Sequence, residues 1–580
     1  MQINLHQTHH TIADFSEIFS YLEQQDNDGV FSNSINLFPE LFLCGYPLQD
    51  LLLTREFIVN YCDLLDKIKL WWSSKPRSNS VLLLGGLSYE IREEIPYAIQ
   101  NVVYELSENE NLKEIYTKCL LPSYDIFDEA KYFTPGNKAI VWKYQDLKFG
   151  ILICEDMWFS PHYKIDPVKE LFEVSKDQKL NGIFNFSASP FYLGKEKSRI
   201  NRASQISQQF SNCPFYYVNR VGSEDEIIFD GGSFHCNHEK VLSKALSFKE
   251  DMVTCTISEA KEINGNYLED VAAHSFETLF RTQLDYTLEP PQLKKLEDSD
   301  YECILHALNL SIMDYADKIG AKKFLVALSG GIDSALVLTL IKLFLRDDQE
   351  VEAVYMPSQY SKGLSYDICK ELCDNLEVKL TTQSIKFLHS AIRNSFSENF
   401  VELSGLADEN IQSRIRGSLI YARSNQNGSI VINTSNKSEL AVGYSTLYGD
   451  SVGAISPLGD LYKSEVFELS KYINKKFENL IPQEVISRPP SAELKENQED
   501  SQSLPAYEIL DAILEGYLSY KYDAQGLIKL GFLENDVNKV LKLNNFSEYK
   551  RKQFCPIVKL KAKSFGFGRR IPITKKAPRR

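Results

Sequence analysis

The chain has 580 residues, of which 43% are hydrophobic, 25% charged and 12% aromatic. This composition is typical of globular proteins rather than of disordered, fibrous or membrane proteins, and the length predicts two large domains. Its net charge of -15 repels phosphate backbones, so we expect no nucleic acid partner. Because no stretch has the length and apolar character of a membrane span, and residues 1–10 lack the pattern of a signal peptide, we expect a cytoplasmic protein with no membrane partner.

The cysteines are scattered along the sequence. Their number, eleven, is odd for a disulfide framework, and they lack the paired spacing of a zinc site. Cys369 and Cys373 lie four residues apart on an expected helix, where two buried thiols are more common than two metal ligands. We therefore expect reduced thiols and no zinc.

The first half alternates short apolar runs with polar helical stretches. The expected strands are residues 1–5, 35–38, 81–84, 149–153, 183–186 and 215–218. Because several of these runs are apolar at consecutive positions, they fit strands that are covered on both faces by other layers. This pattern predicts an α/β domain.

The apolar pattern stops between residues 263 and 300, and Glu289-Pro290-Pro291 lies near the end of that stretch. Such polar, irregular sequence with a proline pair is typical of a boundary between domains. We therefore predict one domain over residues 1–270, a linker over 271–300 and a second domain over 301–580.

The second half begins with a strand-helix-strand pattern. Helices are expected at residues 301–319 and 335–345, and strands at 323–328, 351–356 and 429–433. Two strands joined through a helix lie parallel in one sheet, so a second α/β domain is expected. Residues 488–507 are polar without a strong period and are expected to form a loop.

A glycine-rich turn, Ser329-Gly330-Gly331-Ile332-Asp333-Ser334, joins the expected strand 323–328 to the next helix. Its glycines let backbone N–H groups approach an anion, and the helix N-terminus adds partial positive charge. The turn resembles the phosphate loop of the ATP-pyrophosphatase family. That resemblance implies a Rossmann-like parallel sheet and ATP binding by Ser329, Gly330, Gly331, Asp333 and Ser334.

Later motifs are similar to those of the NAD synthetase family within that group. They are residues 409–417 (ENIQSRIRG), 434–439 (TSNKSE), 444–450 (YSTLYGD), 549–553 (YKRKQ) and 565–570 (FGFGRR). The resemblance implies an ATP contact from Thr434, Mg²⁺ ligands at Asp333 and Glu439, phosphate neutralisation by Lys437, and deamido-NAD contacts from Asn410, Glu439 and Lys550. Four residues depart from the family pattern: Ser435, Ser501, Gln502 and Ala506.

Three ionisable residues of the first half lie at or near the ends of expected strands. Glu40 ends a Phe-Pro-Glu motif, Lys118 precedes a Leu-Pro-Ser-Tyr motif, and Cys154 begins Cys-Glu-Asp. Singly, each fits a cap, a surface charge or a buried small side chain. Together, a base, a cation and a thiol suit amide hydrolysis, with the lysine lowering the pKa of the thiol and helping to stabilise an oxyanion.

These motifs, in this order, resemble the Glu-Lys-Cys triad of the nitrilase, or carbon-nitrogen hydrolase, family. The resemblance implies a four-layer αββα sandwich, with Glu40 as general base, Lys118 as oxyanion stabiliser and Cys154 as nucleophile. It also implies that glutamine is bound by Tyr124, Ser189 and Lys195.

The two resemblances explain each other, because a glutaminase supplies the ammonia that an adenylating domain needs. The implied reaction amidates deamido-NAD with ATP and glutamine as co-substrates, and the family resemblance suggests a homo-oligomer. Two alternatives stay open. One is another amidotransferase with the same ATP loop, such as a GMP or asparagine synthetase, and the other is a nucleotide sensor without catalytic turnover.

Overall fold

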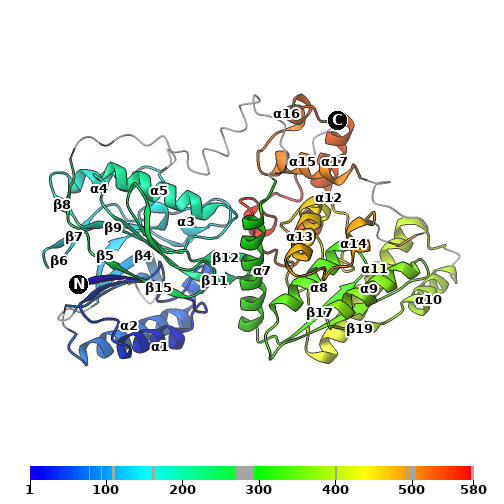
Figure 1. Ribbon diagram of the computed structural model, residues 1–580, viewed down its shortest axis with the longest axis horizontal. Coiled ribbons are helices and arrows are strands. Elements are labelled where there is room, and N and C mark those ends of the chain that lie inside the picture. The colour runs from blue at the N-terminus through cyan, green and yellow to red at the C-terminus, as the bar shows by residue number, and fades with distance from the viewer. Residues whose placement is uncertain are drawn as a thin grey trace. The chain divides into compact units, whose positions relative to one another are not determined.

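The computed structural model describes residues 1–77, 79–92, 95–107, 112–159, 163–264, 267, 293, 295–398, 402–490, 493–495 and 504–576. The chain forms two compact units, Met1–Thr278 and Leu279–Arg580 (Figure 1). Most of the expected linker, 271–300, lies outside the described residues, so its bounds stay a prediction. No helix in the described part of the chain combines the length and the apolar character needed to cross a membrane.

Unit 1 contains two six-stranded mixed sheets. The first has the order β15-β1-β2-β3-β4-β5 and the second β14-β13-β10-β9-β7-β6. The first is built from β1 (Gln2–Gln7), β2 (Ser34–Leu37), β3 (Val81–Arg92), β4 (Ile95–Ser107), β5 (Lys113–Thr117) and β15 (Asp251–Thr256). The second is built from β6 (Val141–Tyr144), β7 (Leu147–Ile153), β9 (Gly182–Ser187), β10 (Phe215–Asn219), β13 (Phe234–Cys236) and β14 (Val241–Lys244).

Helices cover the outer face of each sheet. They are α1 (Phe15–Asn27) and α2 (Arg55–Ser73) on the first sheet, and α4 (Pro167–Ser175) and α5 (Lys195–Gln209) on the second. One buried cluster draws side chains from both sheets, and two more lie between a sheet and its helices. The order of layers is therefore helix, sheet, sheet, helix, as the resemblance implied.

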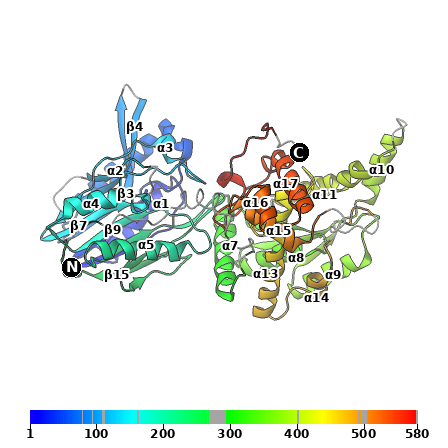
Figure 2. The same ribbon diagram turned by 90° about the horizontal axis from the view of Figure 1, so that it is seen from above.

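Strand β3 shows why consecutive apolar residues occur in this unit. Val81 and Leu83 belong to the core between the sheets, whereas Leu82 and Leu84 belong to the core under α1 and α2. Successive side chains of a strand point to opposite faces, so a strand between two layers needs apolar residues at every position. The strand continues to Arg92, well past the expected end at residue 84, and Figure 2 shows the far ends of β3 and β4 extending beyond the body of the unit.

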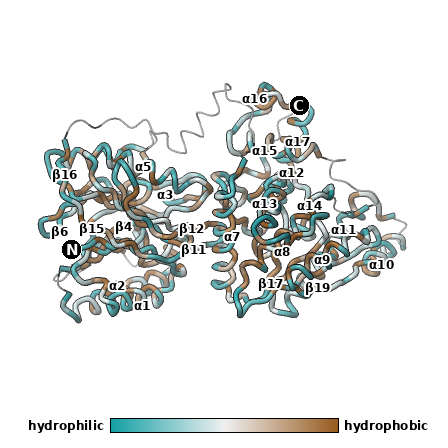
Figure 3. The backbone as a smooth tube through the Cα atoms, viewed as in Figure 1, coloured by the Kyte–Doolittle hydropathy of each residue, from teal (hydrophilic) through white to brown (hydrophobic). Residues whose placement is uncertain are grey.

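Unit 2 contains a four-stranded parallel sheet of order β19-β18-β17-β20. Its strands are β17 (Lys323–Leu328), β18 (Glu350–Tyr355), β19 (Lys379–Thr382) and β20 (Ile430–Val431), and the helices α7 (Asp298–Lys318), α8 (Ile332–Phe344), α9 (Gly363–Asn375), α10 (Lys386–Ser397) and α11 (Gly405–Asn427) accompany it. Figure 3 shows hydrophobic sequence concentrated in β17 and α8. Because the chain adds strands on one side of β17 and then places β20 on the other, the strand order reverses there, which is where α/β sheets bind ligands.

A second, mostly helical core lies next to this sheet in unit 2. Its helices are α12 (Lys437–Val442), α13 (Lys463–Lys476), α15 (Tyr507–Leu518), α16 (Ala524–Lys529), α17 (Glu534–Phe546) and α18 (Glu548–Arg551). The expected strand 323–328 has the observed bounds, and helix α8 begins at Ile332, three residues before its expected start. Residues 488–507 are described only in part, at 488–490, 493–495 and 504–507.

Candidate active sites

In unit 1 the three predicted catalytic side chains come together. Glu40 follows β2, Lys118 follows β5, and Cys154 follows β7 as the first residue of a short 3-10 helix. The Nζ atom of Lys118 lies 2.7 Å from Oε1 of Glu40, and both side chains are almost wholly buried. Both charges also act on the Cys154 thiol. The structure therefore unites residues that are more than 100 positions apart in the sequence.

Backbone packing holds the segment that carries Glu40. The N–H group of Leu43 donates to the carbonyl of Gly85 on β3, at 3.0 Å. A Cβ atom at Gly85 would lie only 2.2 Å from the carbonyl oxygen of Pro39, so this close approach requires glycine. The carboxylate of Glu40 accepts further hydrogen bonds from Asn101 Nδ2, at 2.8 Å, and from the N–H group of Ala188, at 2.9 Å.

A second buried carboxylate, that of Glu129, completes the charge cluster, and the sequence analysis missed it. Its Oε1 atom lies 2.8 Å from Lys118 Nζ and accepts a hydrogen bond from the Tyr46 hydroxyl at 3.0 Å. Burial alone would lower the pKa of Lys118, but the carboxylates of Glu129 and Glu40 outweigh it and raise that pKa well above its usual range. The sequence signal was Phe127-Asp128-Glu129, which follows the Leu-Pro-Ser-Tyr motif closely.

The pKa of the Cys154 thiol differs in direction from the sequence expectation. Burial and the Glu40 carboxylate raise this pKa well above its usual range, and the Lys118 ammonium opposes them only in part. The expectation of a lowered pKa was wrong because it counted the lysine and left out desolvation and the carboxylates. The surroundings of Cys154 thus favour the protonated thiol over the thiolate.

Asp156 holds the strand end that presents Cys154. One carboxylate oxygen accepts from the N–H groups of Cys119 and Leu120, and the other accepts from the Ile153 N–H group and the Tyr116 hydroxyl, all within 3.1 Å. Cys154 itself has a φ of 45°, in the left-handed region. Such a conformation persists only where its surroundings enforce it, and these four hydrogen bonds do so.

The three predicted glutamine-binding residues have different surroundings. The hydroxyl of Tyr124 lies 3.0 Å from both carboxylate oxygens of Glu155, the residue after Cys154. Ser189 is buried just after β9. Lys195 begins α5, and its ammonium lies over the ring of Trp158, 4.5 Å from the ring centroid.

In unit 2 the glycine-rich turn joins β17 to α8 and closes on itself. The Ser329 hydroxyl accepts from the N–H group of Gly331 at 3.1 Å, and the Ser334 hydroxyl donates to the Gly331 carbonyl at 3.1 Å. Gly330 has a φ of 83°, and a Cβ atom there would lie 3.0 Å from the carbonyl oxygen of Ser365. The turn thus leaves the N-terminus of α8 facing a pocket, which suits an anionic ligand.

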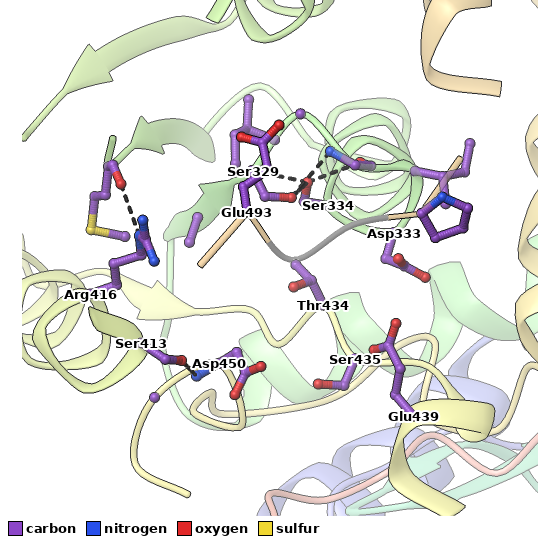
Figure 4. A pocket seen from close by; sticks show the side chains of 18 of the residues that line it. Ser329, Asp333, Ser334, Ser413, Arg416, Thr434, Ser435, Glu439, Asp450 and Glu493 are labelled. Carbon is purple, nitrogen blue, oxygen red and sulfur yellow. Dashed lines mark hydrogen bonds between the residues drawn. The ribbon is translucent and has the colours of Figure 1, made fainter. Parts of the chain in front are cut away.

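That pocket has a volume of about 260 Å³ and lies where the strand order reverses. Its lining includes all the predicted ATP-binding residues: Ser329, Gly330, Gly331, Asp333, Ser334 and Thr434. Thr434 and Ser435, the latter a departure from the family pattern, follow β20 and also line it (Figure 4). Ala506 precedes α15, whereas Ser501 and Gln502 lie outside the described residues.

Two predicted metal ligands, Asp333 and Glu439, lie on one side of the pocket, and Figure 4 shows their carboxylates pointing toward one another. The ammonium of Lys463 lies 2.5 Å from Asp333 Oδ2 and 3.3 Å from Glu439 Oε1. Two carboxylates that share one cation are close enough to share another. Lys463 was not predicted from the sequence, where its only local signal is its place at the start of helix α13.

Three other predicted residues, Lys437, Asn410 and Lys550, are not among those that line the pocket. Lys437 is buried, and its ammonium contacts Asp460 Oδ1 at 2.7 Å and the Lys563 carbonyl at 2.6 Å. A lysine held in this way is poorly placed to neutralise a phosphate, whereas Lys463 does line the pocket.

The predicted deamido-NAD contacts, Asn410 and Lys550, both lie against the segment 443–450. Asn410 accepts a hydrogen bond from the Thr446 hydroxyl at 2.7 Å. Lys550 donates to the carbonyls of Gly443 and Ser445, at 2.7 and 2.6 Å. Asp450 at the end of this segment lines the pocket, so the segment links these residues to it.

A buried base, cation and thiol in one unit and a phosphate-binding turn in the other define a two-site enzyme that pairs hydrolysis with nucleotide chemistry. Two family models match the corresponding parts of the chain, carbon-nitrogen hydrolase over residues 32–261 and NAD synthase over residues 304–554.

Curated relatives match along nearly the whole chain. A glutamine-dependent NAD(+) synthetase from Synechocystis sp. is 36% identical and covers 93% of this chain and 92% of its own length. One from Acinetobacter baylyi is 35% identical, with coverages of 95% and 94%. A solved structure of the glutamine-dependent NAD+ synthetase from Acinetobacter baumannii, in complex with ADP, is 30% identical, with a TM-score of 0.70 over 99% of this chain and 98% of that one.

The chain belongs to the family of glutamine-dependent NAD(+) synthetases, which are ATP-dependent ligases. The expected fold class, with a nitrilase-like first domain and a parallel-sheet second domain, is confirmed. Membership of this family decides against the alternative of a GMP or asparagine synthetase.

Proposed function

We propose that unit 1 releases ammonia from glutamine through Glu40, Lys118 and Cys154, and that unit 2 uses this ammonia to amidate deamido-NAD through an adenylate. The observation that carries the proposal is the buried contact of 2.7 Å between Lys118 and Glu40, whose charges both act on the Cys154 thiol. A base, a cation and a nucleophile in one enclosed space are what amide hydrolysis requires.

In the first half-reaction Cys154 Sγ attacks the carboxamide carbon of glutamine while Glu40 takes the thiol proton. Lys118 has three N–H donors, and Glu40 and Glu129 accept two of them, which leaves one for the oxyanion. Glu40 then gives the proton to the departing nitrogen, and ammonia leaves. Water hydrolyses the remaining γ-glutamyl thioester, which releases glutamate and restores the thiol.

Glutamine would be held by Tyr124, Ser189 and Lys195. The ammonium of Lys195 suits the α-carboxylate of an amino acid, and hydroxyl groups suit the remaining polar atoms. The positions of these residues support this assignment, because Tyr124 lies against Glu155 beside Cys154 and Ser189 follows Ala188, which donates to Glu40.

In the second half-reaction the nicotinate carboxylate of deamido-NAD attacks the α-phosphate of ATP and displaces diphosphate. Ammonia then displaces AMP from the adenylate, which gives NAD. The turn from Ser329 to Ser334 would bind phosphate oxygens through its N–H and hydroxyl groups, with Thr434 after the neighbouring parallel strand β20. We assign to Lys463 the phosphate neutralisation that the sequence analysis gave to Lys437.

Asp333 and Glu439 would hold Mg²⁺, since two carboxylates plus phosphate oxygens and water form a site that this ion prefers. When bound, Mg²⁺ would neutralise charge that develops on the departing diphosphate. Deamido-NAD would contact Glu439 inside the pocket, and Asn410 and Lys550 through the segment 443–450.

The proposal is tested by measuring NAD formation from deamido-NAD and Mg-ATP in wild type and Cys154→Ala, with either glutamine or ammonium as nitrogen source. We expect the variant to lose the glutamine-driven reaction and to keep the ammonium-driven one. Cys213→Ala, which changes another buried cysteine of unit 1, is the matched control and should keep both. Wild type that binds deamido-NAD but forms no NAD with either source would support the sensor alternative instead.

A further inference from the structure

Arg199 is a fully buried arginine on α5, one helical turn after Lys195. Its guanidinium donates five hydrogen bonds. Nε donates to the Ser189 hydroxyl at 3.1 Å, Nη2 donates to the carbonyls of Ser189 and Pro190 at 2.8 and 3.0 Å, and Nη1 donates to both oxygens of Asp230 at 2.7 and 2.9 Å. One side chain thus joins helix α5 to the segment after β9.

The segment 188–190 contacts the general base of the proposed mechanism and carries Ser189, one of its glutamine-binding residues. The N–H group of Ala188 donates to Glu40 Oε2, and the N–H group of Ser189 donates to Asn219 Oδ1, both at 2.9 Å. Its carbonyls face Arg199. The position of Ser189 is therefore set by Arg199, which contacts its hydroxyl and carbonyl, together with Asn219, which contacts its N–H group.

Asp230 fixes the other side of the guanidinium. It ends β12 (Ile227–Asp230), which pairs with β11 (Val221–Glu224), and its side chain is buried. Buried ion pairs contribute little net stability, because desolvation costs about as much as the pair regains. The pair is better explained by the positions that it fixes, since Asp230 orients the guanidinium that contacts residues 189 and 190.

We propose that Arg199 and Asp230 are a positioning pair, which sets Ser189 relative to Lys195 so that both reach the α-amino-acid end of glutamine. The inference rests on the proposed glutamine-binding roles of Ser189 and Lys195. Arg199 connects the two residues, since it lies on the same helix as Lys195 and donates three hydrogen bonds to residues 189 and 190.

The variant Arg199→Lys keeps the positive charge but replaces the planar guanidinium group, with its five N–H donors, by an ammonium group. A lysine has three donors from one atom and cannot reach two carbonyls, a hydroxyl and a bidentate carboxylate together. We expect the KM for glutamine to rise by about tenfold and kcat to change by less than about threefold, because Glu40 keeps its contacts with Lys118 and Asn101. Asp230→Asn should act in the same direction, since it weakens the same contact.

The experiment measures glutamate release and NAD formation by the full chain with varied glutamine, and NAD formation with ammonium as the folding control. The matched control is Arg77→Lys, another buried arginine of unit 1, which pairs with Asp26 at 2.7 Å. Arg199→Ala is assayed with and without guanidinium at a concentration that leaves wild type unaffected. Ser189→Ala and Lys195→Ala test the underlying assignment.

We expect a raised KM in Arg199→Lys, partial recovery of Arg199→Ala by guanidinium, and no change of KM in Arg77→Lys. If Ser189→Ala and Lys195→Ala raise the KM but Arg199→Lys does not, the positioning role is overturned while the glutamine-binding assignment stands. If Ser189→Ala and Lys195→Ala also leave the KM unchanged, that assignment fails, and the positioning role fails with it.

Discussion

Replacing Glu129 by Gln tests whether the second buried carboxylate contributes to glutamine hydrolysis. The glutamine side chain can still accept from Lys118 and from the Tyr46 hydroxyl, so the substitution removes charge and preserves shape. The bond from the Tyr46 hydroxyl changes from one to a charged group, ~1.5–3 kcal/mol, to a neutral one, ~0.5–1.5 kcal/mol, which is a loss of about 1–1.5 kcal/mol. We therefore expect kcat/KM for glutamine to fall by about five- to tenfold.

The pH dependence of this loss is specific to the mechanism. Burial raises the pKa of Glu129 to about 7, with Lys118 opposing and Glu40 reinforcing the change. Below that pKa wild type carries a neutral carboxyl, much like the amide of the variant, and above it the carboxylate is ionised. The difference between wild type and variant should therefore be small near pH 6 and reach its full size near pH 8.

The assay is glutamate release at both pH values, with ammonium-driven NAD formation as the control for folding. Glu105→Gln is a matched variant, because Glu105 is also buried in unit 1 and accepts from Trp142 at 3.0 Å. A loss of equal size at both pH values, or an equal loss in Glu105→Gln, would refute the reasoning.

Three further predictions concern other parts of the molecule. Gly330→Ala should lower NAD formation from both nitrogen sources by about tenfold or more, with glutamate release retained, because alanine disfavours a φ of 83° and would meet the Ser365 carbonyl. Lys463→Met should raise the KM for ATP and also lower the melting temperature, because Asp333 and Glu439 lose their buried cation; a lower melting temperature with unchanged KM would contradict the phosphate role. Burial raises the pKa of Asp156 to about 7, above its unfolded value, so its stabilising contribution decreases as pH rises toward 7; the advantage in melting temperature of wild type over Asp156→Asn should shrink between about pH 5 and pH 8.

The sequence predicted the elements whose residues carry a strong local signal. The strand 323–328 and the turn after it could be located because a buried parallel strand is apolar throughout and a phosphate turn needs glycine at set positions. The end of β3 could not, since residues 90–92 are exposed and two of them, Glu90 and Arg92, are charged.

The residues of the candidate sites also divide into those that the sequence could predict and those that only the folded structure shows. Glu40, Lys118 and Cys154 lie in motifs, so their approach could be anticipated from the convergence of strand ends. Glu129 and Lys463 stand in no motif that we used, and only the folded chain places them beside the other charges. Lys437 shows the converse, because its neighbours in the sequence suggested a phosphate contact whereas folding pairs it with Asp460.

The raised pKa of the Cys154 thiol has a consequence for how the protein withstands oxidants. Peroxide attacks thiolates, and a sulfur that keeps its proton is converted slowly to sulfenic acid. In the proposed mechanism Glu40 takes that proton as the sulfur attacks a carboxamide, so the sulfur becomes reactive in the presence of its substrate. The proposed mechanism therefore predicts that peroxide oxidises Cys154 slowly in intervals when glutamine is scarce.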